Sequence, residues 1–194
     1  MPVWSWFFIA AAVLVVLTLV MLAVLSVNSR RKTARLKEHF GAEYKRTVDE
    51  AGDQRAAEQE LIARERKRQK LDVVELSPDA HKRFAEQWHV VQRVFVDDPS
   101  GAVGEADRLV TEVMRERGYP VDDFDQRASD ISVDHPDTVE HYRAAHTLYL
   151  AQEKADIGTE AQRQAFVHYR ALFEQLLGAD RESTEKNSPK EARA

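Results

Sequence analysis

The tetrapeptide His-Tyr-Arg-Ala occurs twice near the end of this 194-residue chain, at residues 141–144 and again at residues 168–171. Two histidines in matching contexts could form a paired chemical site, because imidazole is both a common general acid or base and a common metal ligand. The same repetition arises when two similar helices pack together, each with a tyrosine in the core. Tyr142 and Tyr169 each lie on the apolar stripe of their own segment, so we favour two packed helices. Each arginine of the repeat also lies at helical spacing from an acid, which predicts the ion pairs Glu140–Arg143 and Arg170–Glu174.

The other candidate chemistries have the wrong spacing. His135, His141 and His146 are separated by six and five residues, and on a helix a step of five turns a side chain about 140° from the starting face. The four-residue spacing of a helical zinc motif is absent, the acidic segment 122–134 lacks the glycine and the last glutamate of a calcium loop, and SGAVG lacks the lysine of a phosphate loop. The chain has no cysteine, which excludes thiolate chemistry and disulfides. We therefore expect no catalytic residue, no metal, no cofactor and no identifiable small-molecule substrate.

A second group of chemically capable side chains lies between Tyr119 and His146. We expect them to form either a buried polar network that joins the last helices or a recognition surface, and we favour the network because buried charge must be paired. The same residues would carry the alternative function, a membrane-tethered ligand-binding or enzymatic domain. The group consists of Asp125, Arg127, Asp130, His135, Tyr142, Arg143 and His146.

The densest cationic stretch is RERKRQK at residues 64–70. Residues 30–70 carry 13 Lys or Arg against 8 Asp or Glu, a net charge of +5, whereas residues 71–178 carry 11 against 21, a net charge of −10. We expect this basic patch either to remain a solvated helix face or to dock on the acidic part of the same or a neighbouring molecule. Nucleic-acid binding is not expected, because the patch has no interleaved aromatic residues and the acidic part would repel phosphate. The basic patch consists of Arg64, Arg66, Lys67, Arg68 and Lys70.

The first structural element that the sequence predicts is an uncharged run of 24 residues from Trp4 to Val27. As a helix this run would extend roughly 36 Å, enough to cross a lipid bilayer with some tilt. It predicts a transmembrane anchor over residues 1–29 of a single-pass protein of the cell (plasma) membrane. The basic cluster at residues 30–32 predicts that the N-terminus lies outside and that the soluble domain is cytoplasmic.

Residues 30–76 predict a charged helical stalk and linker. Helices are expected over residues 32–51 and 54–70, because Gly52 is a natural helix stop and Asp53 a natural N-cap. The apolar residues of the first helix step by four and form a narrow stripe, which can lie against a partner but cannot build a core of its own. We therefore expect a protein partner or self-association, with a coiled-coil dimer as one possible form. The stripe consists of Leu36, Phe40, Tyr44 and Val48.

Residues 77–178 predict a helical bundle. Ser77 is the expected N-cap of its first helix, with Pro78 at the first helical position, and Gly178 is the expected end of the last helix. No strand pattern occurs, and the polar tail 179–194 is expected to be disordered. The predicted fold is therefore all-α, with one N-terminal transmembrane helix, a charged helical stalk, and a four- to five-helix soluble bundle.

Two stretches also carry a family resemblance. They are FGAEYKRTVDEAGDQRAAEQEL at residues 40–61, and GYPVDDFDQR followed by DHPDTVEHYRAAH within residues 118–146. The chain resembles a bacterial family, common in actinobacteria, of short proteins with one N-terminal span and a helical soluble part. The resemblance covers most of residues 35–177, and it implies this architecture without a mechanism. The function expected from the sequence is therefore that of a single-pass membrane-anchored, non-enzymatic helical interaction or scaffold protein.

Overall fold

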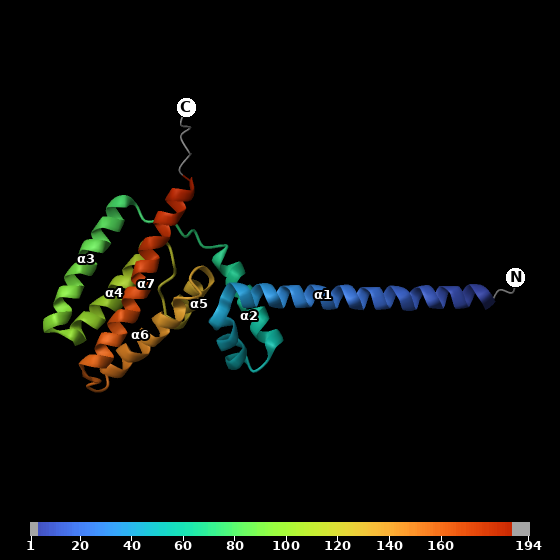
Figure 1. Ribbon diagram of the computed structural model, residues 1–194, viewed down its shortest axis with the longest axis horizontal. Coiled ribbons are helices and arrows are strands. Elements are labelled where there is room, and N and C mark those ends of the chain that lie inside the picture. Colours follow the sequence, from blue (N-terminus) through green and yellow to red (C-terminus); the bar gives the residue numbers. More distant parts are fainter. Residues whose placement is uncertain (1–3, 188–194) are drawn as a thin grey trace, which may run out of the picture.

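The computed structural model of the chain describes residues 4–187, which form seven helices and no strand (Figure 1). The all-helical part of the predicted fold is therefore confirmed. The helices are α1 (Trp4–Ala51), α2 (Gln54–Arg68), α3 (Pro78–Asp97), α4 (Pro99–Glu116), α5 (Phe124–Asp134), α6 (Val139–Gln152) and α7 (Gly158–Asn187).

The predicted transmembrane helix is wrong. The apolar run from Trp4 to Val27 is helical, but it continues without a break into the charged residues of the same helix, α1. Within the part of the chain that the structure describes, no helix combines the length and the apolar character that crossing a membrane requires. This finding does not support the predicted single-pass anchor over residues 1–29, and it equally removes the basis for the predicted cell-membrane location and orientation. Residues 1–3 lie outside the described residues.

Helix α1 is not straight, because its backbone changes direction at Gly41. The dihedral angles there are φ 51° and ψ −122°, a combination that glycine adopts readily and that residues with a Cβ avoid. Figure 1 shows the long first part of α1 projecting away from the other helices, whereas its last turns fold back beside α2. The break between α1 and α2 agrees with the prediction, since Gly52 has a φ of 66° and the Asp53 carboxylate accepts a hydrogen bond from the backbone N–H of Ala56 at 2.9 Å.

The kink turns the predicted stalk into a helical hairpin with a small core. Leu36, Phe40 and Leu61 are each 0% exposed, and Val133 of α5 packs in the same cluster. The stripe does not build this core alone, since Leu61 of α2 and Val133 of α5 complete it within the same chain. A straight helix would present these residues along a narrow line, whereas the bend at Gly41 wraps them around the α2 side chains.

The second core lies among α3, α4, α5, α6 and α7. Trp88 of α3 stacks on Phe173 and Phe166 of α7, with ring centroids 4.5 Å and 5.1 Å apart. Ser77 caps α3 as predicted, since its hydroxyl accepts a hydrogen bond from the N–H of Ala80 at 3.1 Å. The fully buried members of this core are Ala102, Val103, Ala106, Val110, Val113, Met114, Ala128, Ile131, Val139, Tyr142, Ala145, Ala165, Tyr169, Leu172 and Leu176.

The last helix extends further than predicted. Gly178 does not have the positive φ of a helix-ending glycine, and α7 continues through it to Asn187. Residues 179–187 of the expected tail are therefore helical, while residues 188–194 lie outside the described part of the chain.

Candidate functional site

The most concentrated charge in the described chain surrounds Glu43, which lies just after the kink of α1 and is 0% exposed. Its Oε1 atom accepts hydrogen bonds from Arg64 of α2 at 2.8 Å, from Arg143 of α6 at 3.0 Å and from Arg46 of α1 at 3.2 Å. Hydrogen bonds between charged partners are about twice as strong as neutral ones. A single carboxylate thereby joins three helices, and we call these four residues the Glu43 cluster.

The Glu43 cluster has one carboxylate at its centre and more cations than that carboxylate can neutralise. Arg64 also pairs with Glu60, and Arg46 also pairs with Glu50; the side chains of these two acids are 50% and 54% exposed. Arg143 has only Glu43 as an ion-pair partner among the described residues. Burial lowers the pKa of Arg143 from its usual value, although Glu43 acts in the opposite direction. The charge of Arg143 therefore depends on Glu43 more than the charge of the other two arginines does.

A second row of ion pairs joins the basic patch to α5. Lys67 Nζ lies 3.1 Å from Asp130 Oδ2, and Arg68 pairs with Asp134. Asp134 also accepts a hydrogen bond from the Tyr119 hydroxyl, and burial raises the pKa of that phenol well above its usual value. The basic patch thus docks on the acidic bundle of the same molecule, which is one of the two arrangements expected for it.

Two members of the basic patch take no part in this docking. Arg66 and Lys70 are exposed, and neither makes an ion pair with any residue that the structure describes. Lys67 and Arg68 therefore form the ion pairs between hairpin and bundle, and Arg64 pairs within the hairpin and donates a 3.5 Å hydrogen bond to Ser132 of α5. Arg66 and Lys70 remain on a solvated face.

The predicted polar residues of the bundle do not form one network. Arg127 donates a hydrogen bond from Nε to the Tyr142 hydroxyl at 2.9 Å, linking α5 to α6. His146 stacks on Phe124 with ring centroids 3.7 Å apart, and its Nδ1 lies 3.9 Å from Asp107 of α4. Asp130 and Arg143 instead face the hairpin. The structure therefore divides the set between bundle contacts and docking contacts.

His135 and Asp125 stand apart from both groups. His135 is buried, and neither ring nitrogen has a hydrogen-bond partner among the described residues. Burial, and then the positive charges of Arg117 and Arg68, lower the pKa of His135, while Asp134 opposes the shift. Asp125 is exposed in the first turn of α5.

Sequence reasoning missed Glu43, although a signal for it exists. Glu43 follows Leu36 by seven residues and Phe40 by three, which places its carboxylate on the apolar face of the helix. A carboxylate on such a face requires a buried cation. The predicted Glu140–Arg143 pair was wrong, because Arg143 reaches Glu43 instead.

The repeated tetrapeptides lie on α6 and α7, which pack side by side as predicted. Tyr142 and Tyr169 are both 0% exposed, with ring centroids 6.4 Å apart. The predicted Arg170–Glu174 pair is present at 3.7 Å. The same packing brings His141 and His168 together on the surface, with their Nδ1 atoms 2.9 Å apart.

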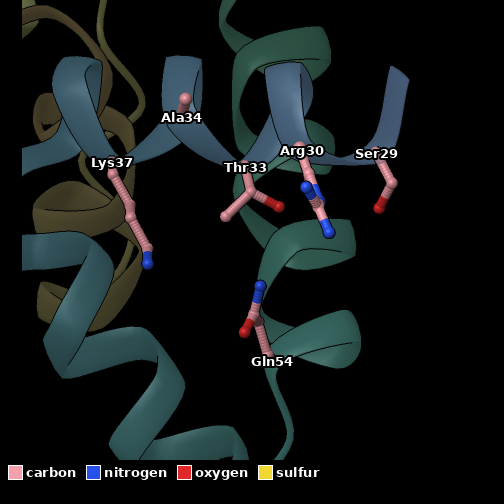
Figure 2. Close-up of a pocket in the computed structure, with 6 residues that line it drawn as sticks. All are labelled: Ser29, Arg30, Thr33, Ala34, Lys37 and Gln54. Carbon is pink, nitrogen blue, oxygen red and sulfur yellow. The ribbon is translucent and has the colours of Figure 1, made fainter. Parts of the chain in front are cut away.

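A hollow between α1 and α2 is the third feature of the hairpin. Figure 2 shows Arg30, Thr33 and Lys37 directed from α1 toward Gln54 of α2. A neighbouring hollow shares Lys37 and Gln54, so the two form one groove, which we call the hairpin groove. It is lined by Ser29, Arg30, Thr33, Ala34, Lys37, Gly41, Tyr44, Lys45, Val48 and Gln54.

The fold and these sites define the chain as an all-helical protein in which a kinked hairpin docks on a helical bundle through buried ion pairs. No family model matches the chain, and no match is found among curated proteins or solved structures. The resemblance to the actinobacterial family stays a prediction.

Proposed function

We propose that this chain is a non-enzymatic helical interaction or scaffold protein whose hairpin groove binds an acidic segment of a protein partner. The observation that carries the proposal is the charge of the groove. Arg30, Lys37 and Lys45 line it, and none of its lining residues is an acid. Among the described residues, none of these three cations makes an ion pair.

The nearest carboxylate is committed to the hairpin itself. Glu58 is buried, and its Oε1 accepts hydrogen bonds from Thr33 at 2.7 Å, Gln54 at 2.8 Å and Tyr44 at 3.0 Å. Burial alone would raise the pKa of Glu58, but these hydrogen bonds lower it below the usual value. Glu58 therefore stays ionised while it accepts hydrogen bonds from three of the lining residues, and the surface cations remain available to a partner.

The groove also offers an apolar contact. Tyr44 and Val48 line its second half, and Lys37 Nζ lies 5.5 Å from the centre of the Tyr44 ring. Cationic side chains beside an aromatic ring suit a segment that mixes carboxylates with apolar residues. Electrostatic complementarity of this kind determines partner choice and association rate.

The alternative, an enzymatic or ligand-binding site between Tyr119 and His146, has less support. Arg127 is engaged with Tyr142, Asp130 with Lys67, and Arg143 with Glu43. A catalytic group needs its polar atoms available to the substrate, whereas these atoms serve contacts between helices.

The test uses the full chain and a fluorescent peptide of alternating Glu and Leu, compared with a Gln-and-Leu peptide. We expect fluorescence anisotropy to report binding of the Glu peptide alone, weakening as salt is added. The double charge reversal K37E/K45E should reduce affinity by about tenfold or more, since each tenfold corresponds to about 1.4 kcal/mol. The matched control K82E/R93E changes the net charge equally at exposed positions of α3 and should leave affinity unchanged.

Two results would refute the proposal. Equal binding of the Glu peptide to both double variants would show that only net charge matters. Equal binding of the Glu and Gln peptides would show that the groove does not select acidic residues.

A further inference from the structure

We infer that His141 and His168 form a two-histidine surface site for a divalent transition-metal ion that favours square coordination, Cu²⁺ or Ni²⁺. The site lies on α6 and α7, away from the hairpin groove, and does not rest on the function proposed above. His141 and His168 come from the two copies of the same tetrapeptide, so one repeated pattern supplies both ligands.

The separation of the two nitrogens matches a particular coordination geometry. Imidazole nitrogens lie about 2.0–2.1 Å from such ions, so two of them at an angle of about 90° are roughly 2.9 Å apart. A tetrahedral angle would require roughly 3.3 Å. The Nδ1 atoms of His141 and His168 are 2.9 Å apart, which is the spacing of neighbouring ligands in the square arrangement typical of Cu²⁺ and Ni²⁺. The same spacing lets one ring donate a hydrogen bond to the other, and the ion would take the place of that proton.

The bundle holds the two rings in place. Each histidine precedes a fully buried tyrosine, Tyr142 or Tyr169, and these anchors fix α6 and α7 relative to each other. The two Nδ1 atoms are therefore held at the separation that neighbouring ligands of one ion require. Ligands fixed in this way by their supporting helices lose little freedom on binding.

The pair is accessible from solvent. His141 is exposed, so an ion can reach both rings from outside the bundle.

The protein supplies two ligands, and water completes the coordination. Within the described residues, no group of three or more His, Cys, Asp or Glu side chains could hold a metal ion. The second histidine nevertheless acts intramolecularly once the first has bound, so the pair should bind about a hundredfold more tightly than either alone.

The experiment titrates the full chain with Ni²⁺ by calorimetry and with Cu²⁺ by electron paramagnetic resonance. We expect one ion per chain and a copper signal with coupling to two nitrogens. Affinity should fall about a hundredfold in both H141Q and H168Q, while the matched control H89Q removes an exposed histidine of α3 and should change nothing. Circular dichroism checks that the three variants remain folded, as expected for substitutions on the surface.

The dependence on both histidines decides the outcome. If H141Q and H168Q bind Ni²⁺ as tightly as the unaltered chain, the ion is held elsewhere and the inference is wrong. It is also wrong if only one of the two variants loses affinity, because a single histidine would then account for all the binding.

Discussion

Replacing Glu43 with glutamine is the sharpest test of how the hairpin is held to the bundle. The substitution keeps the size and shape of the side chain but removes the negative charge that three arginines share. Arg64 retains Glu60 and Arg46 retains Glu50. Arg143, whose side chain is only 15% exposed, would be left without a counter-charge.

The expected loss of stability follows from this difference. Removing one partner of a buried ion pair costs about 3–5 kcal/mol, because the remaining charge is buried without compensation. Since two of the three arginines keep a second carboxylate, we expect the lower end, about 3 kcal/mol. That is a large part of a typical stability of about 5–15 kcal/mol.

Urea unfolding with linear extrapolation measures this loss, and native-state hydrogen exchange locates it. Exchange should rise first in α1 after Gly41 and in α2, because Glu43 of α1 would lose its ion pairs with Arg64 of α2 and Arg143 of α6. The matched control E50Q breaks an ion pair of Arg46 in which the Glu50 side chain is 54% exposed, and it should cost about 0.2–1 kcal/mol. If E43Q and E50Q lose the same stability, Glu43 does not hold the hairpin to the bundle.

Three further predictions concern the backbone, a buried base and the small core. Gly41→Ala should destabilise the chain by about 1–3 kcal/mol, because alanine is strained at this backbone conformation. The control Gly178→Ala, within α7, should stabilise the chain by about 0.4–1 kcal/mol. Thermal unfolding measures both changes. Because the pKa of His135 is lowered in the fold, the unfolded chain binds the extra proton as the pH falls through about 6.5. Urea midpoints should therefore show stability falling by up to about 1.4 kcal/mol per pH unit below that value, and His135→Phe should flatten this slope; an unchanged slope would refute the assignment. Phe40→Ala should lower the free energy of unfolding, measured in urea, by about 3–5 kcal/mol. Hydrogen exchange should increase only in α1, α2 and α5. A uniform increase across the bundle would contradict the two-core description.

Two of the helix boundaries could be predicted because their signals are local, whereas the end expected at Gly178 was wrong. Ser77 with Pro78, and Gly52 with Asp53, mark their helix ends through interactions within a few residues, and the structure agrees at both places. Gly41 could not be recognised in this way. A glycine in a helical pattern is usually tolerated, and only contacts of Leu36 and Phe40 with α2 decide that this one becomes a bend.

The Glu43 cluster could be predicted only in part. The helical period places Glu43 on an apolar face, which indicates a buried cation but does not say which one. Arg143 lies 100 residues later in the chain, and its nearer partner Glu140 offered a plausible local pair. Pairings over such distances depend on how whole helices dock, and the spacing of residues within one helix carries no information about that.

The cations of the hairpin serve two separate purposes, and this separation makes the proposals independently testable. Lys67 and Arg68 pair with Asp130 and Asp134 of α5, where they fix the hairpin to the bundle. Lys37 and Lys45 line the groove on α1, where no acid of the described chain pairs with them. E43Q should therefore loosen the docking of the hairpin while leaving the groove cations in place. K37E/K45E should weaken peptide binding by about tenfold or more without lowering stability by a comparable amount. If E43Q also abolishes binding of the acidic peptide, the groove exists only while the hairpin is docked, and the buried cluster controls the availability of the surface site.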